Sequence, residues 1–180
     1  TGCWVGIPRD ARVVEGIDDT TSYTLSLFRA HDGKSAWSWG DLIDEVDGLR
    51  RMALLWNHRG RIPRDEWTLE ANFALEHFPG YQSIQWMGAD LRMRWLLPLA
   101  GNEAAQNFRL TADHPNYPLA MQARNSGEQR FSNSFQLVQG GRGFVLYTPL
   151  FLKDAKGQRQ FDGFLQGVFR VEPLMSELLA

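Results

Sequence analysis

Few residues of this chain have the types and spacing that catalysis or nucleotide binding requires. Residues 140–143 read Gly-Gly-Arg-Gly and could cradle a phosphate, as glycine loops do where a strand runs into a helix. Here the following residues, 144–147, are aromatic and β-branched, which is typical of a strand. Two adjacent glycines also supply the positive φ angles that a tight hairpin needs. We therefore interpret residues 140–143 as a turn between two strands.

The other groups that could do chemistry are scattered along the chain. The histidines share no metal-ligand spacing, so no zinc site is expected. They are His31, His58, His77 and His114. Cys3 is the single cysteine, which excludes an internal disulfide, and no Gly-x-Ser-x-Gly motif offers a serine nucleophile. Asp65 and Glu66 fit the solvated start of a helix. The sequence predicts no catalytic residue, no metal and no cofactor.

Composition places the chain among ordinary globular domains. Its 180 residues suit one domain, and 43% hydrophobic with 22% charged residues allow a core to form. A net charge of −2 argues against nucleic-acid binding. Seven tryptophans and eleven phenylalanines predict a core built on aromatic side chains. No apolar run approaches the roughly 18 residues of a membrane span.

Two helices are predicted in the first half of the chain. Ser38 and Asp41 fit a capping box ahead of a helix over 41–59, in which apolar residues recur at intervals of three and four. These residues are Leu42, Val46, Leu49, Ala53 and Trp56. Pro63 suits the first position of a second helix, which the Phe-Pro-Gly sequence at 78–80 ends.

From residue 81 onward the apolar period changes from helical to alternating, which indicates strands. The predicted strands cover 81–88, 91–99, 129–138, 143–152 and 161–171, with a hairpin at 88–90 between the first two. In the second strand Met93 and Trp95 alternate with arginines, so we expect one buried and one solvated face. A short helix over 115–127 ends at Gly127, and residues 172–180 begin a last helix. This order predicts an α+β fold with an antiparallel sheet of about five strands.

Five segments, in this order and spacing, resemble the CHASE domains. These are extracytoplasmic sensor modules of histidine kinases, diguanylate cyclases and plant cytokinin receptors. The segments are FPGYQSIQWMG, LRMRWLLPLAGNE, PLAMQARNSG, SFQLVQGGRGFVLYTPLF and FDGFLQGVFRVEPL. The resemblance covers residues 65–175 and implies a PAS-like sheet with a ligand in its membrane-distal half. It divides the chain into an N-terminal segment without resemblance (1–37), a stalk helix (38–62), a PAS-like CHASE sensor domain (63–175) and the start of a C-terminal helix (172–180).

The resemblance also implies ligand-binding residues. Cytokinin-binding relatives hold adenine with an aspartate, and Arg109 stands at the matching position. This reversal of charge argues against a cytokinin-like ligand and suggests an anionic or carboxylate-bearing molecule instead. The resemblance further implies Phe131, Ser132, Tyr147, Thr148, Phe164 and Gln166. Trp86 is also expected at the site, as an aromatic residue of a predicted strand. Phe131 and Gln166 replace smaller residues of relatives and would reduce the cavity.

The leading interpretation is the periplasmic ligand-sensing domain of a bacterial inner-membrane receptor, with membrane helices outside this chain. Such a receptor would form a homodimer through the 41–59 helix and carry a cytoplasmic kinase or cyclase, while this domain is no enzyme. The alternative is a ligand-free dimerisation or partner-binding module. A pocket lined by Arg109, Tyr147 and Phe164 would favour the first, and a filled core with Arg109 facing solvent the second. A third interpretation, an enzyme or sugar binder that uses the tryptophans, would need two carboxylates on one cleft, and no spacing suggests them.

Overall fold

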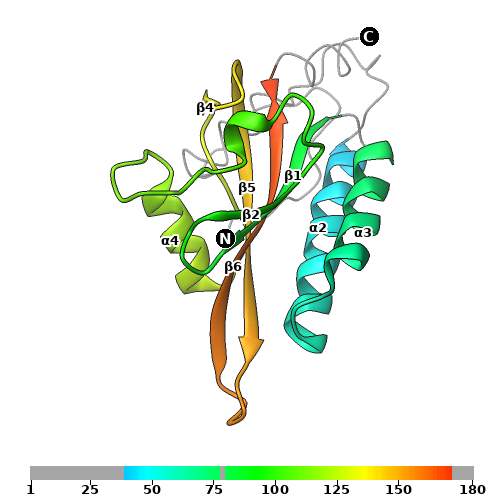
Figure 1. Ribbon diagram of the computed structural model, residues 1–180, viewed down its shortest axis with the longest axis vertical. Helices are drawn as coiled ribbons and strands as arrows, with labels where there is room; N and C mark the ends of the chain where they lie inside the picture. Colours follow the sequence, from blue (N-terminus) through cyan, green and yellow to red (C-terminus); the bar gives the residue numbers. More distant parts are fainter. Residues whose placement is uncertain (1–38, 78–79, 172–180) are drawn as a thin grey trace.

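A six-stranded antiparallel sheet forms the centre of the molecule (Figure 1). The computed structural model describes residues 39–77 and 80–171, with side chains from residue 48 onward. The strands are β1 (Tyr81–Gly88), β2 (Met93–Leu97), β3 (Arg130–Phe131), β4 (Phe135–Gln136), β5 (Arg142–Lys153) and β6 (Arg159–Arg170). Their order is β2-β1-β6-β5-β3, and β4 also pairs with β5. The predicted α+β class is confirmed.

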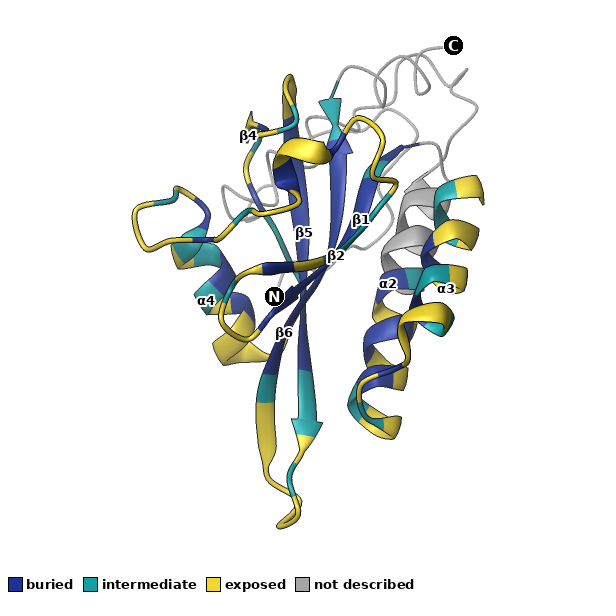
Figure 2. Cartoon of the chain, in the orientation of Figure 1, coloured by how far each residue is buried: buried dark blue, intermediate teal, exposed yellow. Residues whose placement is uncertain are grey.

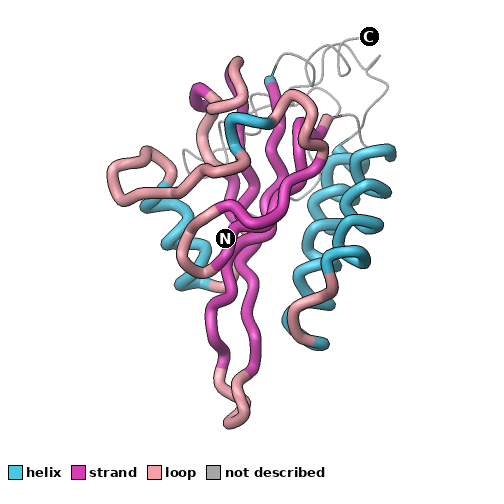
Figure 3. Tube along the Cα trace, viewed as in Figure 1, coloured by secondary structure: helices cyan, strands magenta, loops and turns pink. Residues whose placement is uncertain are grey.

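Helices cover both faces of this sheet. Helices α2 (Trp39–Arg59) and α3 (Arg64–His77) lie side by side on one face (Figure 1). Helix α4 (Tyr117–Ser126) lies on the other face, together with a long connection from β2 that contains the short helix η1 (Glu103–Ala105) (Figure 3). None of the described helices is long and apolar enough to cross a bilayer.

Each face of the sheet therefore has its own apolar core, visible as dark blue strands in Figure 2. On the α2 side, Leu49, Ala53 and Trp56 of the predicted helical stripe are buried, as expected. The side chains of Leu42 and Val46, and Ser38 as a whole, lie outside the described residues. The predicted aromatic core is confirmed on this face, where Trp86 packs against Trp56 and Trp95 with ring centroids 5.1 and 4.4 Å apart.

The glycine segment forms a hairpin, as predicted. Gly140 and Gly141 have φ angles of 89° and 76°, and they connect β4 to β5. The Leu137 amide donates to the Gly141 carbonyl (2.9 Å), which closes the turn. The chain continues into the long strand β5 and not into a helix, so a nucleotide loop is excluded here.

The second strand differs from its prediction, because its two large apolar residues face opposite sides of the sheet. Met93 packs in the core on the α4 side, and Trp95 packs against the core on the α2 side. The cause is a bulge: Trp95 pairs with Trp86, but Met93 pairs with Met87, so Arg94 is an extra residue on β2. One extra residue reverses the alternation of side chains. Both faces are covered, and the expectation of one solvated face was wrong.

Other boundaries changed less. The second helix begins at Arg64, one residue after Pro63, and α4 ends at Gly127 in the left-handed conformation (φ 74°), as predicted. The predicted strand over 129–138 is two short strands, β3 and β4. Between them, the Ser132 hydroxyl accepts the Val145 amide of β5 (2.9 Å), so a side chain replaces a backbone partner. Residues 172–180, where a last helix was predicted, lie outside the described residues.

A candidate site between the sheet and the β2–α4 connection

A small cavity lies on the α4 side of the sheet. Three strands supply buried polar residues to its wall: Gln85 from β1, Tyr147 from β5 and Gln166 from β6. Alternation along each strand turns these side chains toward the α4 side. Apolar side chains complete the lining, among them Met93, Phe108, Phe135, Leu137, Val145 and Val168. The cavity has a volume of about 40 Å³, which is room for roughly three water molecules.

The two glutamines leave hydrogen-bond acceptors available to a ligand. Gln85 donates from its Nε2 to the Ser83 hydroxyl (2.7 Å), and Gln166 contacts the Met87 sulfur with its Nε2 (3.8 Å). A glutamine amide has two donors and one acceptor, and among the described residues these contacts use only the amino groups. Both side chains are almost completely buried. Buried amides are costly to leave unsatisfied, which makes them suitable for recognising a polar ligand.

Tyr147 is held as a neutral donor. Burial raises the pKa of its phenol well above the ordinary value, and the nearby Asn116 side chain opposes this only in part. The ring packs edge-to-face against Phe164, with centroids 5.5 Å apart. Asn116 has a buried side-chain nitrogen with no partner among the described residues. Tyr147 and Asn116 together form a polar group at the base of α4.

His114 closes the cavity on the side of the long connection. Its ring lies edge-on to Phe108 and Phe135, with centroids 5.5 and 5.7 Å away, and its Nδ1 accepts the Asn116 amide (3.1 Å). Burial lowers the pKa of His114, although the charge of Asp113 opposes the shift. The imidazole is therefore neutral in this arrangement.

The structure brings together only part of the predicted site. Tyr147 and Gln166 line the cavity, and Phe164 packs in the same core. Trp86, Phe131 and Thr148 lie toward the α2 side, where Trp86 is in the core, Phe131 packs on it and Thr148 faces an outer hollow. Ser132 pairs with Val145, and Arg109 is exposed and does not line the cavity.

Sequence reasoning missed Gln85 and His114. Gln85 and Ser83 stand two residues apart on one face of β1, and both are buried. A short polar pair within this strand was the available signal. His114 lies in an irregular connection, where the sequence carries no such signal. Within the described residues, no three histidine, cysteine, aspartate or glutamate side chains gather where they could hold a metal ion.

Comparison with known proteins identifies the fold and the family. A solved structure, the "Extracellular ligand binding receptor from Desulfohalobium retbaense DSM5692", matches with a TM-score of 0.61 and 13% sequence identity. The match covers 92% of this chain and 27% of that one, so this chain spans about a quarter of the receptor's length. No curated protein matches the chain. The family model of the CHASE domain matches residues 61–180, two thirds of the sequence. The chain therefore belongs to the CHASE domain family and is an extracytoplasmic sensor domain.

Proposed function

We propose that this chain is the periplasmic ligand-sensing part of a bacterial inner-membrane receptor, a histidine kinase or a diguanylate cyclase. One observation carries the proposal of ligand binding. Three buried polar side chains, Gln85, Tyr147 and Gln166, come from three strands and line the same cavity. Convergent polar groups in an otherwise apolar cavity are what small-molecule sites present.

The size and charge of the cavity restrict the ligand. Its volume of about 40 Å³ suits a molecule of only a few non-hydrogen atoms, unless the connection that carries His114 moves. Its lining contains neither arginine nor lysine. An anion would therefore meet no opposite charge, and Arg109, which was expected to supply it, is exposed. We propose a small uncharged ligand with both donor and acceptor groups.

A thermal-shift screen tests this proposal. The purified domain is heated with small amides, alcohols, nucleobases and carboxylates, beside the variants Gln166→Leu and Arg109→Ala. A ligand at a hundred times its Kd stabilises the fold by about 2.7 kcal/mol, or about 5–10 °C for a chain of this size. We expect an uncharged compound to shift the wild type and Arg109→Ala, but not Gln166→Leu. A shift produced only by carboxylates and lost in Arg109→Ala would refute the assignment of the cavity.

A second candidate function, dimerisation without a ligand, has its own observation. Apolar side chains are exposed on the helical pair: Leu54 (58%) and Leu55 (40%) on α2, Leu69 (70%) and Phe73 (57%) on α3. Burial of such side chains against a second copy would be favourable. Sedimentation of the wild type and of Phe73→Lys decides the matter. A dimer that becomes a monomer in the variant, with no compound active in the screen, would favour this function.

A further inference from the structure

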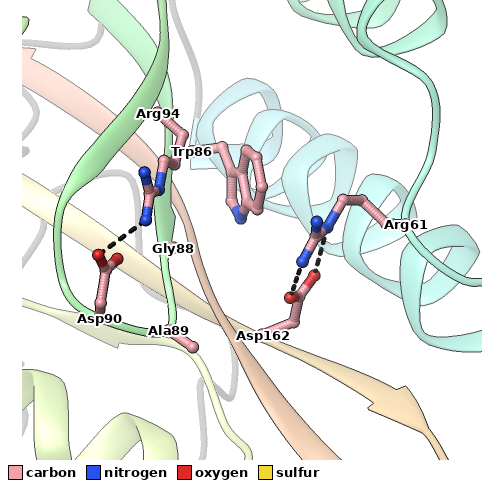
Figure 4. Close-up of a pocket in the computed structure, with 7 residues that line it drawn as sticks. All are labelled: Arg61, Trp86, Gly88, Ala89, Asp90, Arg94 and Asp162. Carbon is pink, nitrogen blue, oxygen red and sulfur yellow. Dashed lines mark hydrogen bonds and ion pairs between the residues drawn. The ribbon is translucent and has the colours of Figure 1, made fainter.

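An open hollow of about 470 Å³ lies on the side of the sheet that faces α2 and α3 (Figure 4). It is separate from the cavity that His114 and Gln166 line, since the two share no lining residue. Its residues come from the α2–α3 loop, the β1–β2 hairpin and β6. They are Arg61, Trp86, Gly88, Ala89, Asp90, Arg94 and Asp162.

One wall of the hollow is a buried ion pair. Asp162 is almost fully buried and accepts the Trp56 indole N–H (2.8 Å) and the Arg61 Nε–H (3.1 Å). The Arg61 Nη2 group donates to the second oxygen, so the guanidinium binds the carboxylate in fork geometry. Asp162 therefore fixes the position of the Arg61 guanidinium. The Arg61 side chain as a whole is 49% exposed.

The opposite wall is a second ion pair. Arg94 donates from its Nη2 to Asp90 (2.7 Å), and Arg92 lies 3.9 Å from the same carboxylate. Gly88 lies against this pair: a Cβ there would stand 3.0 Å from the Arg94 Nε and 3.1 Å from an Asp90 oxygen. A larger residue at position 88 would displace the pair, so the glycine helps to hold Arg94 at the edge of the hollow.

Trp86 forms the floor between the two arginines. Figure 4 shows its ring between the Arg61 and Arg94 guanidinium groups, with its nitrogen edge turned toward the hollow. The Arg61 guanidinium lies over the ring at 4.9 Å from the centroid. Trp86 is only 6% exposed, and its Nε1 has no hydrogen-bond partner among the described residues. A buried donor without an acceptor is costly, and such groups are rare in folded proteins.

The hydrogen-bond inventory of the hollow favours an acceptor. Both carboxylates already accept arginine donors, whereas each guanidinium carries five N–H groups and uses two or fewer on its carboxylate. The Trp86 N–H adds an unused donor. Unused donors thus exceed unused acceptors, and they lie around a flat aromatic floor. We propose that this hollow is a second binding site, which takes a small carboxylate between Arg61 and Arg94, next to the Trp86 side chain.

The planar shape of the carboxylate matches this arrangement. Each guanidinium is planar and keeps N–H groups in its plane beyond those that bind Asp162 or Asp90, and planar donors suit a carboxylate better than a tetrahedral phosphate. Arg61 and Arg94 are each about half exposed, so added salt should weaken the binding. This site lies outside the cavity of the proposed function, and neither proposal depends on the other.

The test is an NMR titration of the tryptophan indole N–H signals with sodium acetate and benzoate, at constant ionic strength against sodium chloride. The Trp86 signal is assigned with Trp86→Phe. We expect that signal to shift saturably with either carboxylate, and the Kd to rise about tenfold or more in Arg94→Gln. Arg92→Gln is the matched control, since Arg92 neighbours Asp90 but does not line the hollow. It should leave the Kd unchanged within about twofold.

Three outcomes would overturn the proposal. The first is that the Trp86 signal does not shift, or shifts linearly and to the same extent with chloride. The second is that Arg92→Gln weakens binding as much as Arg94→Gln, which would mean that only general charge matters. The third is that inorganic phosphate binds more tightly than acetate, which would reject a carboxylate site. Gln166→Leu, which alters the cavity of the proposed function and not this hollow, should leave the Trp86 titration intact. This separates the result from any failure of the proposed ligand-sensing function.

Discussion

His114 is held in one protonation state by its contacts. Its Nδ1 accepts the Asn116 amide (3.1 Å), and a protonated nitrogen cannot accept. The ring also lies between Phe108 and Phe135, where a positive charge would lose hydration. Both effects favour the neutral imidazole, in agreement with the lowered pKa of His114. The connection over the cavity is thus most stable when this histidine is uncharged.

We predict that the thermal stability of the domain falls as the pH is lowered through the range just below 6.5. The folded pKa of His114 is below its ordinary value of 6.5, so the unfolded chain takes up the proton first. The stabilisation is complete above pH 6.5 and is lost as the pH falls toward the folded pKa. Hydrogen bonds lower the pKa values of Asp113 and Asp154, so those carboxyls titrate at more acidic pH.

The measurement is the Tm of the wild type and of His114→Gln between pH 8 and pH 5. The variant should show a flatter profile below pH 6.5, where the wild type loses the stabilisation. His58→Gln changes an exposed histidine of α2 and should keep the wild-type profile. A wild-type slope retained in His114→Gln would contradict the prediction.

At the scale of elements, local signals were sufficient for the boundaries that depend on local chemistry. The strand β1 has the predicted bounds 81–88, since alternation and flanking glycines are both visible in the sequence. Helix α4 ends at Gly127 because a left-handed residue there favours glycine. The bulge at Arg94 depends on register with β1, which no local pattern records. The same holds for the Arg61–Asp162 pair, whose members are 101 residues apart in the sequence.

The family resemblance placed candidate residues on strands, but it did not determine which face of the sheet each side chain reaches. Tyr147 and Gln166 lie in the long strands β5 and β6 and line the cavity, whereas Thr148, next to Tyr147 on β5, faces the hollow on the other side. Arg109 was assigned by spacing through an irregular connection, in which a small shift changes which side chain faces inward. In the structure its neighbour Phe108 lines the cavity and Arg109 pairs at an isolated bridge with Arg92.

Close contact between β1 and β6 leads to a prediction for Gly163. This residue pairs with Gly88, has φ 117°, and a Cβ there would overlap the Met87 carbonyl oxygen. Backbone strain and backbone overlap both oppose a side chain, so Gly163→Ala should lower the free energy of unfolding by about 3 kcal/mol or more. Gly157→Ala is the control, with φ 77° but open space, and should cost about 1–2 kcal/mol. Urea unfolding measures both, and equal losses would show that the contact is unimportant.

At the scale of the whole molecule, the second half of α2 is part of the domain. Leu49 and Trp56 lie in the core of the sheet, and Asn57 accepts the Phe151 amide of β5 (2.7 Å). The strands that α2 contacts also line the cavity on their other face: in β6, Leu165 packs on the α2 side and Gln166 faces α4. A change in the cavity can therefore reach α2 through the thickness of one strand.

This shared core predicts that α2 and the sheet unfold together. Leu49→Ala removes a fully buried side chain from the contact of α2 with the sheet and should cost about 3 kcal/mol. Leu54→Ala, one turn further along α2 on its exposed side, should change stability by less than about 0.5 kcal/mol. Unfolding followed by far-UV circular dichroism and by tryptophan fluorescence should give coincident curves in the wild type and both variants, since Trp56, Trp67, Trp86 and Trp95 join α2, α3 and the sheet. If the helical signal of Leu49→Ala were lost before the fluorescence changed, α2 would be an independent stalk. A single transition would instead mean that α2 and the sheet that lines the candidate cavity form one cooperative unit.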